Sequence, residues 1–400
     1  MQEFNPQEFV NKQVAEIRNV ANDGKALIAV SGGVDSTTCA VLAHRALGEN
    51  LLCVTLDDAF MRTGEPERIA QLLSQPPLNL PMKILNVQKH FLSALEGLRD
   101  AEEKRKAFRE TFYKTLSETA RKESFIFLIQ GTIRADIDET TRGIKTQHNV
   151  LSQMGISPAE RYGFQLIEPL MSIYKPQVRE VARHLGIPPE LSERQPFPGP
   201  GLSVRIVGQN RIDKLESLKK ATAIAEENLA KHRPDQYFTA IIDNEEKPHH
   251  LRLTHIREIV AQHLNVSSRR VFVKVFQDKA TGMKGGVRHY GGIVAVRVQT
   301  TNDGVRQPPV HNLVNLQTKI IAANPSFTRV LYAVQETSKK QPYVIAMRAI
   351  QTHDFLTAEV SDIPWTTLSQ TAQKILEACS NVSCVYYDVT PKPPATIEME

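Results

Sequence analysis

The chain has 400 residues, more than one compact domain usually uses, which favours two or three domains. Charged residues make up 23% and hydrophobic residues 41%, a balance that is typical of globular proteins and argues against a disordered chain. The net charge of +5 comes without a dense basic run, so we expect no nucleic-acid partner. The four cysteines show no C-x-x-C spacing, and no apolar run is long enough to span a membrane. A disulfide scaffold, a zinc site and a membrane anchor are therefore not expected, and a cytoplasmic location is.

The first half of the chain alternates between apolar runs and helical stretches. A helix is expected over residues 6–23, where apolar side chains recur at helical spacing. Continuous apolar runs predict buried strands, with helical stretches between them, at 26–30, 51–57, 82–87 and 125–132. This alternation indicates an α/β domain whose parallel sheet is covered on both faces.

The pattern changes at residues 195–201, where three prolines and two glycines exclude a helix or a central strand. We expect a second domain of α+β character and place the two domains at 1–208 and 209–400. The second is predicted to contain helices at 211–232, 311–323 and 365–380 and strands at 271–276, 293–298, 330–334, 343–350 and 385–389.

A weak internal similarity links residues 290–300 and 341–352. Each runs from an aromatic residue through an apolar strand to an arginine and a Gln-Thr pair. A duplicated βαβ unit would explain the similarity, and so would the ordinary composition of strands.

The strongest local motif is SGGVDST, Ser31–Thr37, between a predicted strand and a predicted helix. Its glycines would let backbone amides approach an anion, the hydroxyls of Ser31, Ser36 and Thr37 add donors, and the helix N-terminus adds partial positive charge. The carboxylate of Asp35 would face phosphates only through a divalent cation, which predicts Mg²⁺. The ending of a Walker A loop is absent. The alternative is a plain Gly-Gly turn with Ser36 as a helix cap.

SGGVDS resembles the PP-loop of the N-type ATP pyrophosphatases, which cleave ATP between its α and β phosphates. The family is narrowed by three further motifs, which resemble the synthetase part of GMP synthase: QGTI (130–133), PFPGPGL (196–202) and KPPATIEME (392–400). Supporting matches are EEKRK (102–106), IKTQHN (144–149), EPL (168–170) and RAIQTHDF (348–355). The resemblance covers residues 10–208 and 269–400. It implies an adenine-nucleotide α-hydrolase-like PP-loop domain followed by an α+β dimerisation domain.

The resemblance implies a ligase reaction. The O2 atom of xanthosine monophosphate attacks the α-phosphate of ATP, pyrophosphate leaves, and ammonia then displaces AMP to give GMP. No amidotransferase domain precedes the PP-loop, so ammonia would come from solution or from a separate glutaminase subunit. The C-terminal domain of this family dimerises, which implies a homodimer.

An ATP site follows from the same resemblance. The expected ATP-binding residues are Ser31, Gly32, Gly33, Val34, Asp35, Ser36, Thr37, Asp57, Gly131 and Thr132. The expected catalytic residues are Asp35, which would also hold the metal, Lys175 and Asp136. Each has a purely structural alternative: a strand-end aspartate for Asp57, a solvated helix-start lysine for Lys175, and a helix-start acid for Asp136.

The nucleotide substrate would be bound by residues from four motifs: Arg134, Pro198, Gly199, Gly201, Arg288, Lys392, Ile397 and Glu398. Arg194 and Arg205 flank the proline-rich run and would add positive charge for a phosphate. Taken alone, that run is an interdomain linker. Segment 102–109 resembles the family's mobile lid, although its composition alone predicts a solvated helix face.

Several residues depart from the family's pattern. Asp57-Asp58-Ala59 stands where the family has Asp-Asn-Gly, Gly286 replaces an aspartate, and Met399 replaces a tryptophan. The missing glycine at position 59 puts the shape of that loop in question. These departures keep two alternatives open: a paralogue that acts on a different oxo-nucleotide, and a non-catalytic regulatory paralogue that binds nucleotide without turnover.

Overall fold

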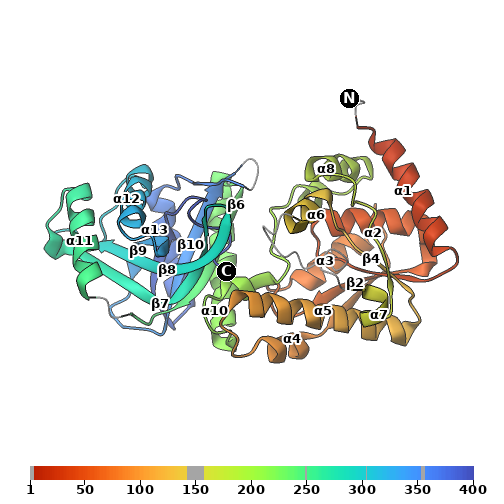
Figure 1. Ribbon diagram of the computed structural model, residues 1–400, viewed down its shortest axis with the longest axis horizontal. Helices are drawn as coiled ribbons and strands as arrows, with labels where there is room; N and C mark the ends of the chain where they lie inside the picture. Colours follow the sequence, from red (N-terminus) through yellow and green to blue (C-terminus); the bar gives the residue numbers. More distant parts are fainter. Residues whose placement is uncertain (1–3, 142–156, 248–249, 303, 353–355) are drawn as a thin grey trace. The chain divides into compact units, whose positions relative to one another are not determined.

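The computed structural model describes residues 4–141, 157–247, 250–302, 304–352 and 356–400. The chain forms two compact units (Figure 1). The first contains residues 1–95 and 105–200, and the second contains residues 96–104 and 201–400. Among the described residues, no helix is both long enough and apolar enough to cross a membrane.

The first unit is built on a parallel sheet with the strand order β3-β2-β1-β4-β5. Its strands are β1 (Ala26–Ala29), β2 (Leu51–Asp57), β3 (Met82–Asn86), β4 (Phe127–Ile129) and β5 (Gln165–Ile167). Its helices are α1 (Pro6–Ala21), α2 (Val34–Leu47), α3 (Glu65–Ser74), α4 (Gln88–Leu95), α5 (Ala101–Glu123), α6 (Arg134–Thr141), α7 (Pro158–Tyr162), α8 (Lys175–His184) and α9 (Pro189–Ser192). The buried apolar residues of β1 pack with those of α1, α2 and α8 in one core. The order of the strands reverses at β1, where a ligand of an open α/β sheet binds.

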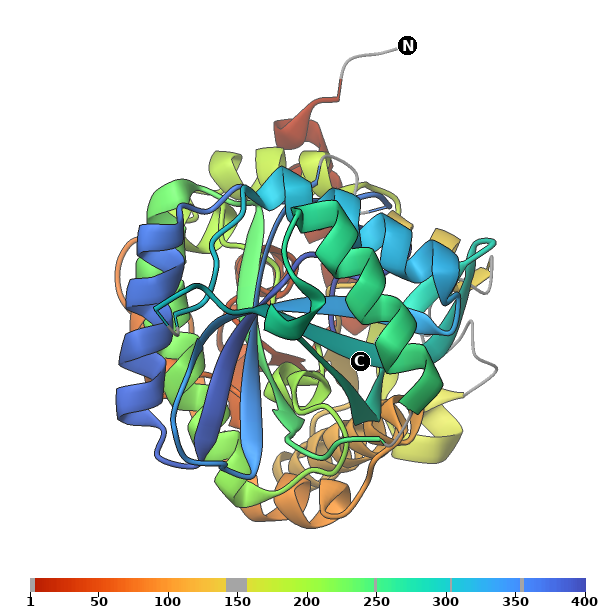
Figure 2. The same cartoon turned by 90° about the vertical axis from the view of Figure 1, so that its left-hand side faces the viewer.

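The second unit is a mixed sheet, and its long path runs β11-β10-β12-β9-β8-β7, with β6 also paired to β10. Its strands are β6 (Gln236–Asp243), β7 (Val271–Lys284), β8 (Val287–Val298), β9 (Phe327–Glu336), β10 (Tyr343–Gln351), β11 (Glu359–Val360) and β12 (Val382–Asp388). Its helices are α10 (Ile212–Leu229), α11 (His250–Leu264), α12 (Val310–Ala323) and α13 (Trp365–Ala378). Figure 2 shows α11, α12 and α13 beside these strands.

Two parallel βαβ crossovers form most of this sheet. Strands β8 and β9 pair in parallel and are joined by α12, whereas β10 and β12 pair in parallel and are joined by α13. The two segments with the shared sequence pattern, 290–300 and 341–352, begin these two crossovers. The similarity therefore coincides with a repeated topology.

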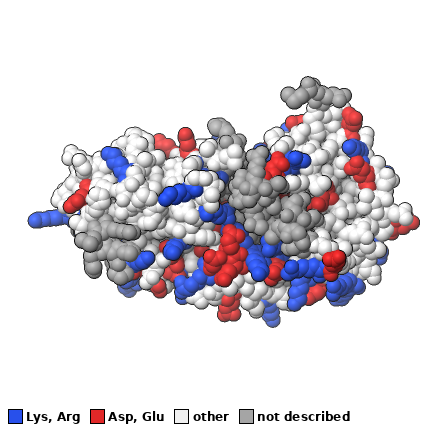
Figure 3. Space-filling model, in the orientation of Figure 1, with Lys and Arg blue, Asp and Glu red and all other residues white. Residues whose placement is uncertain are grey.

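The α/β class predicted from the sequence is confirmed. Most predicted elements agree with the structure within a few residues, but β4 ends at Ile129, because residues 130–132 leave the sheet to form a loop. Strands β5 and β6 and helix α11 were not predicted. On the face drawn in Figure 3, acidic and basic side chains are interspersed, in keeping with the small net charge.

Candidate active site

The motif at residues 31–37 connects β1 to α2 at the carboxyl edge of the parallel sheet. Gly33 is the N-cap of α2, so the free amides of its first turn point towards the loop. Gly32 has a φ of +73°, and a Cβ there would lie 2.8 Å from the Ile69 side chain. The Ser36 hydroxyl donates to the carbonyl of Gly33 at 3.1 Å and lies 3.2 Å from the Ser31 hydroxyl. No side chain caps the helix, so the alternative of Ser36 as an N-cap is wrong.

The loop after β4 packs against the first turn of α2. A Cβ on Gly131 would lie 3.1 Å from both the Asp35 carbonyl carbon and the Ser36 amide nitrogen, so only glycine allows this approach without a shift. The buried hydroxyl of Thr132 donates to Glu168 at 2.5 Å. Burial raises the pKa of Glu168, and the Thr132 hydrogen bond opposes that rise. Gly131 and Thr132 thus lie beside the loop, where the strand order reverses.

The three predicted catalytic residues come together at the start of α2. Lys175, the first residue of α8, places its Nζ 2.5 Å from Oδ2 of Asp35. Burial raises the pKa of Asp35, the charge of Lys175 lowers it, and the negative charge of Asp136 raises it. Oδ2 of Asp136 accepts the amide of Ile133 at 3.0 Å. Among the described residues, Oδ1 of Asp35 is buried without a hydrogen-bond partner.

Asp57 ends β2, and its Oδ2 accepts a hydrogen bond from Gln88 at 2.6 Å. Ala59, which stands in place of a glycine, has a φ of +72°, so the loop keeps a conformation that normally favours glycine. Asp58 supports it by accepting the amide of Phe60 at 2.8 Å. The changed sequence therefore does not change the glycine-like backbone of this loop. Nothing in the sequence pointed to Gln88.

The substrate residues predicted for the first unit lie at its surface or near the loop. Arg134 is half exposed and pairs with Asp138 at 3.0 Å. Pro198 is partly buried and Gly199 is exposed. Arg194 binds the buried carboxylate of Glu65, and its Nη1 would lie 3.2 Å from a Cβ on Gly32. A cation thus lies beside the PP-loop, and the sequence did not indicate Glu65 as its partner.

The remaining substrate residues belong to the second unit. Gly201 is buried at the start of a short 3₁₀ turn that ends at Arg205. The guanidinium of Arg205 forms a two-pronged pair with Glu398, with both distances 2.9 Å, and lies over the Phe238 ring. Arg205 is 2% exposed. It therefore contacts a predicted substrate residue and is not an open phosphate-binding group in this structure.

The other predicted residues of this unit lie on the C-terminal segment 390–400 and on the neighbouring hairpin. Ile397 packs against the core, and the backbone of Lys392 pairs with Ala358. The carbonyl of Pro394 accepts the amide of Met283, which is paired across the hairpin with Arg288. Arg288 binds Glu102 at 3.1 Å. The segment and Arg288 are thus brought to one region of this unit.

Two departures from the family's pattern have structural roles. Gly286 and Gly285 form the two-residue turn between β7 and β8, and both have positive φ, +79° and +58°. Met399 is completely buried in the core of the second unit. Neither residue marks a change at a ligand-facing surface.

Segment 102–109 is not a uniformly solvated helix face, as its composition suggested. Lys104 is completely buried, binds Glu400, and donates to the carbonyl of Ile206 at 2.6 Å. The motif at 144–149 and residues 353–355 of the motif at 348–355 lie outside the described residues.

The parallel sheet and its strand–loop–helix motif define an ATP-binding PP-loop protein. The PP-loop domain family matches residues 6–188, and the GMP synthase C terminal domain family matches residues 333–399.

Relatives match over the whole chain. The ATP pyrophosphatase subunit of GMP synthase (glutamine-hydrolyzing) from Sulfurisphaera tokodaii is 40% identical over 399 residues, which are 99% of this chain and 100% of the relative. The same subunit from Saccharolobus solfataricus is 42% identical over 397 residues, with the same coverage. That from Methanopyrus kandleri is 37% identical over 404 aligned residues, which are 99% of this chain and 100% of the relative. The chain belongs to the family of ATP pyrophosphatase subunits of GMP synthase. It is a PP-loop ligase of purine biosynthesis.

Proposed function

We infer that this chain, as the ATP pyrophosphatase subunit of a GMP synthase, catalyses the ATP-dependent amination of xanthosine monophosphate to GMP. The O2 atom of the base displaces pyrophosphate from the α-phosphate of ATP, and ammonia then displaces AMP. The observation that supports this most directly is the full-length identity to the corresponding GMP synthase subunits, in a chain whose PP-loop has phosphate-binding geometry. We further propose that residues 1–208 form the ATP-pyrophosphatase domain and 209–400 the substrate-binding and dimerisation domain.

We propose that the PP-loop binds the pyrophosphate part of ATP. The amides at the start of α2 and the hydroxyls of Ser31, Ser36 and Thr37 would donate to phosphate oxygens. The hydroxyl of Thr37 is buried and has no partner in the described part of the chain, so a ligand oxygen would satisfy it. Negative charge grows on the leaving pyrophosphate, and preformed donors stabilise it without reorganisation.

Asp35 is suited to hold Mg²⁺. Its Oδ1 is buried without a partner, and an uncompensated carboxylate oxygen is a favourable ligand for a hard cation. A bound Mg²⁺ would neutralise phosphate charge. Lys175 pairs with Asp35 in the ligand-free chain, and we propose that its ammonium group contacts the phosphates once ATP is bound. Asp136 would fix the loop before α6 through the amide of Ile133.

The nucleotide substrate would be bound through its phosphate and through its base or ribose. We assign Lys392 and Arg288 to the phosphate, Ile397 and Glu398 to the base or ribose end, and four further residues to supporting loops: Arg134, Pro198, Gly199 and Gly201. The positive φ of Ala59 and the structural roles of Gly286 and Met399 remove three reasons to prefer a different oxo-nucleotide.

Ammonia would be supplied by a separate glutaminase. The relatives are each named as one subunit of a glutamine-hydrolyzing GMP synthase, which implies a second, glutamine-hydrolysing subunit. We also propose that the chain forms a homodimer through its second domain.

The test is a reconstitution with the purified chain. With xanthosine monophosphate, ATP, Mg²⁺ and ammonium it should form GMP, AMP and pyrophosphate in equal amounts. With glutamine as the only nitrogen donor it should form no GMP. Pyrophosphate release with another oxo-nucleotide but not with xanthosine monophosphate would replace the substrate, and binding without release would favour a regulatory protein.

A further inference from the structure

The last part of the chain is ordered without a helix or strand. Residues 390–400 follow β12, and Thr390, Ala395, Met399 and Glu400 are all buried. A segment with no regular backbone ladder needs other partners for its polar groups. We call residues 390–400 the C-terminal segment and ask what holds it.

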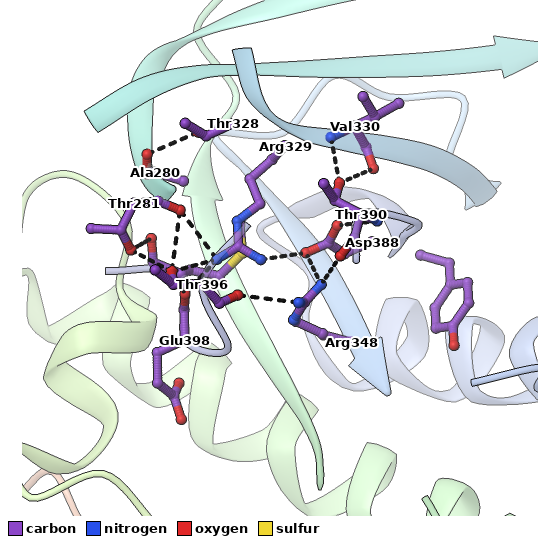
Figure 4. A network of polar contacts seen from close by, with 12 residues as sticks. Ala280, Thr281, Thr328, Arg329, Val330, Arg348, Asp388, Thr390, Thr396 and Glu398 are labelled. Atoms are coloured by element: carbon purple, nitrogen blue, oxygen red, sulfur yellow. Dashed lines mark hydrogen bonds and ion pairs between the residues drawn. The ribbon is translucent and has the colours of Figure 1, made fainter. Parts of the chain in front are cut away.

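Two buried arginines meet beneath this segment (Figure 4). Arg329 lies on β9 and Arg348 on β10, and their side chains are 0% and 1% exposed. Both donate to the same oxygen of Asp388, at the end of β12, at 2.9 and 2.8 Å. Strands β10 and β9 lie on either side of β12, so the sheet itself brings the three side chains together.

The remaining donors of both guanidinium groups point to the C-terminal segment. Nη2 of Arg329 donates to the hydroxyl of Thr396 at 2.9 Å and to the carbonyl of Glu398. Arg348 donates to the carbonyl of Thr390 at 2.8 Å and to that of Thr396 at 3.1 Å. The backbone is thus fixed on both sides of Ile397, and the carboxylate of Glu398 continues to Arg205.

The charges make these contacts strong. Two cations share Asp388, and burial together with the charge of Arg348 lowers the pKa of Arg329 to about 10, so both stay protonated at neutral pH. Buried cations need acceptors, since leaving their donors unpaired is costly. The oxygens of the C-terminal segment supply four of those acceptors. The segment and the arginines therefore stabilise each other.

We propose that Arg329 and Arg348 are positioning residues for the nucleotide substrate, which hold residues 396–398 so that Ile397 and Glu398 are in place before the nucleotide binds. This proposal rests on the proposed function, in which these two side chains contact the nucleotide. The arginines touch no substrate themselves. Without them the segment would have to be ordered at the expense of binding energy.

The test compares three variants of the full chain. Arg348→Met removes the donors to Thr390 and Thr396 but leaves Arg329 and Asp388 as a balanced pair, so the fold should persist. Thr396→Val is gentler, because it removes only one hydroxyl. Thr222→Val is the matched control: that threonine is equally buried in the second unit and its hydroxyl also bonds another threonine, Thr239, at 2.9 Å.

Two measurements are made on each variant. Calorimetry gives the dissociation constants for xanthosine monophosphate and, separately, for Mg²⁺–ATP. Hydrogen exchange gives the opening of the amides of residues 395–400. Arg348→Met should raise the dissociation constant for xanthosine monophosphate at least about tenfold and that for ATP less than about twofold. It should speed exchange of those amides, whereas Thr222→Val should do neither. Thr396→Val should show the same selectivity with a smaller effect.

The outcomes separate the two proposals. If the parent chain does not bind xanthosine monophosphate, the proposed function is wrong and the positioning role falls with it. If the parent chain binds it, but the variants bind both ligands normally or lose both equally, the positioning role alone is wrong. Should Arg348→Met fail to fold, Thr396→Val against Thr222→Val decides the question. Unchanged exchange at residues 395–400 in both variants of the network would also overturn the proposal.

Discussion

The PP-loop of the first unit and the C-terminal segment of the second present ligand-binding candidates in opposite ways. In the PP-loop, Oδ1 of Asp35 and the hydroxyl of Thr37 are buried without partners in the described part of the chain. In the C-terminal segment, the hydroxyl of Thr396 and the carbonyls around it all bind Arg329 or Arg348. The first segment therefore keeps polar groups for a ligand, whereas the second uses them to fix its own position. A change in the PP-loop should affect chemistry, and a change beneath the C-terminal segment should affect order.

The largest effect is expected from Asp35→Asn in the PP-loop. The metal ligand is lost and the charge of the leaving pyrophosphate is left uncompensated, so pyrophosphate release should fall by about 100-fold or more. Stability should change little, because Asp35 and Lys175 are each about a quarter to a third exposed and such pairs contribute about 1 kcal/mol or less. Steady-state pyrophosphate release and urea unfolding measure the two. Glu193→Gln, at a surface pair in the same unit, is the control. Near-normal turnover of a folded Asp35→Asn protein would contradict the PP-loop assignment.

Asp388→Asn should show the reverse pattern. It removes the anion shared by two buried arginines, and breaking a buried ion pair in this way costs about 3–5 kcal/mol. The chain has a single tryptophan, Trp365, in α13 of the second unit, so its fluorescence follows the unfolding of that unit. The urea midpoint of the fluorescence transition should fall strongly. An unchanged midpoint would mean that the two arginines do not depend on Asp388.

Lys392→Ala tests whether the C-terminal segment contacts the substrate at all. A lysine–phosphate contact contributes about 1.5–3 kcal/mol, so the KM for xanthosine monophosphate should rise at least about tenfold while the KM for ATP changes little. Each substrate is varied while the other is saturating. Equal effects on both would indicate a folding or assembly defect. No effect on either would withdraw Lys392, Ile397 and Glu398 from the substrate site.

Glu400→Gln is expected to have the smallest effect, and one that depends on pH. Burial raises the pKa of Glu400 to about 7, against the attraction of Lys104. The folded chain then binds more protons than the unfolded chain between its ordinary pKa, about 4.5, and 7, so stability falls as pH rises through this window and levels off above it. The Trp365 transition should show this slope in the parent chain and a weaker slope in Glu400→Gln. Identical slopes would show that the Glu400 carboxyl titrates as in water.

The PP-loop was predictable because its residues are contiguous and their neighbours are set by one strand and one helix. Asp35, Lys175 and Asp136 were chosen through the family resemblance, and the structure brings them together. The partners of the second unit were not predictable in this way. Arg329 and Arg348 are single polar residues in apolar strands, and Asp388, to which both bind, follows 59 and 40 residues later.

Lys104 shows the same limit from the other side. It lies in a run of charges that predicts a solvated helix face, yet it is completely buried because Glu400, 296 residues away, reaches it. Local composition reports solvent exposure only when no distant partner changes it. Strand β6 was missed for a related reason, since it pairs with β10, about a hundred residues further along the chain.

The shared use of Asp388 also constrains how the chain is made. Arg329 leaves the ribosome 59 residues before Asp388, an interval of roughly 3–12 seconds at cellular synthesis rates. During that time neither arginine has its anion, and Thr396 follows later still. Both guanidinium groups must stay in water until then, which keeps β9 and β10 from closing into a finished sheet. The PP-loop unit has no such delay, because its elements are complete by residue 200. Synthesis thus imposes an order in which the nucleotide-cleaving unit folds first and the second unit closes only as its last residues emerge.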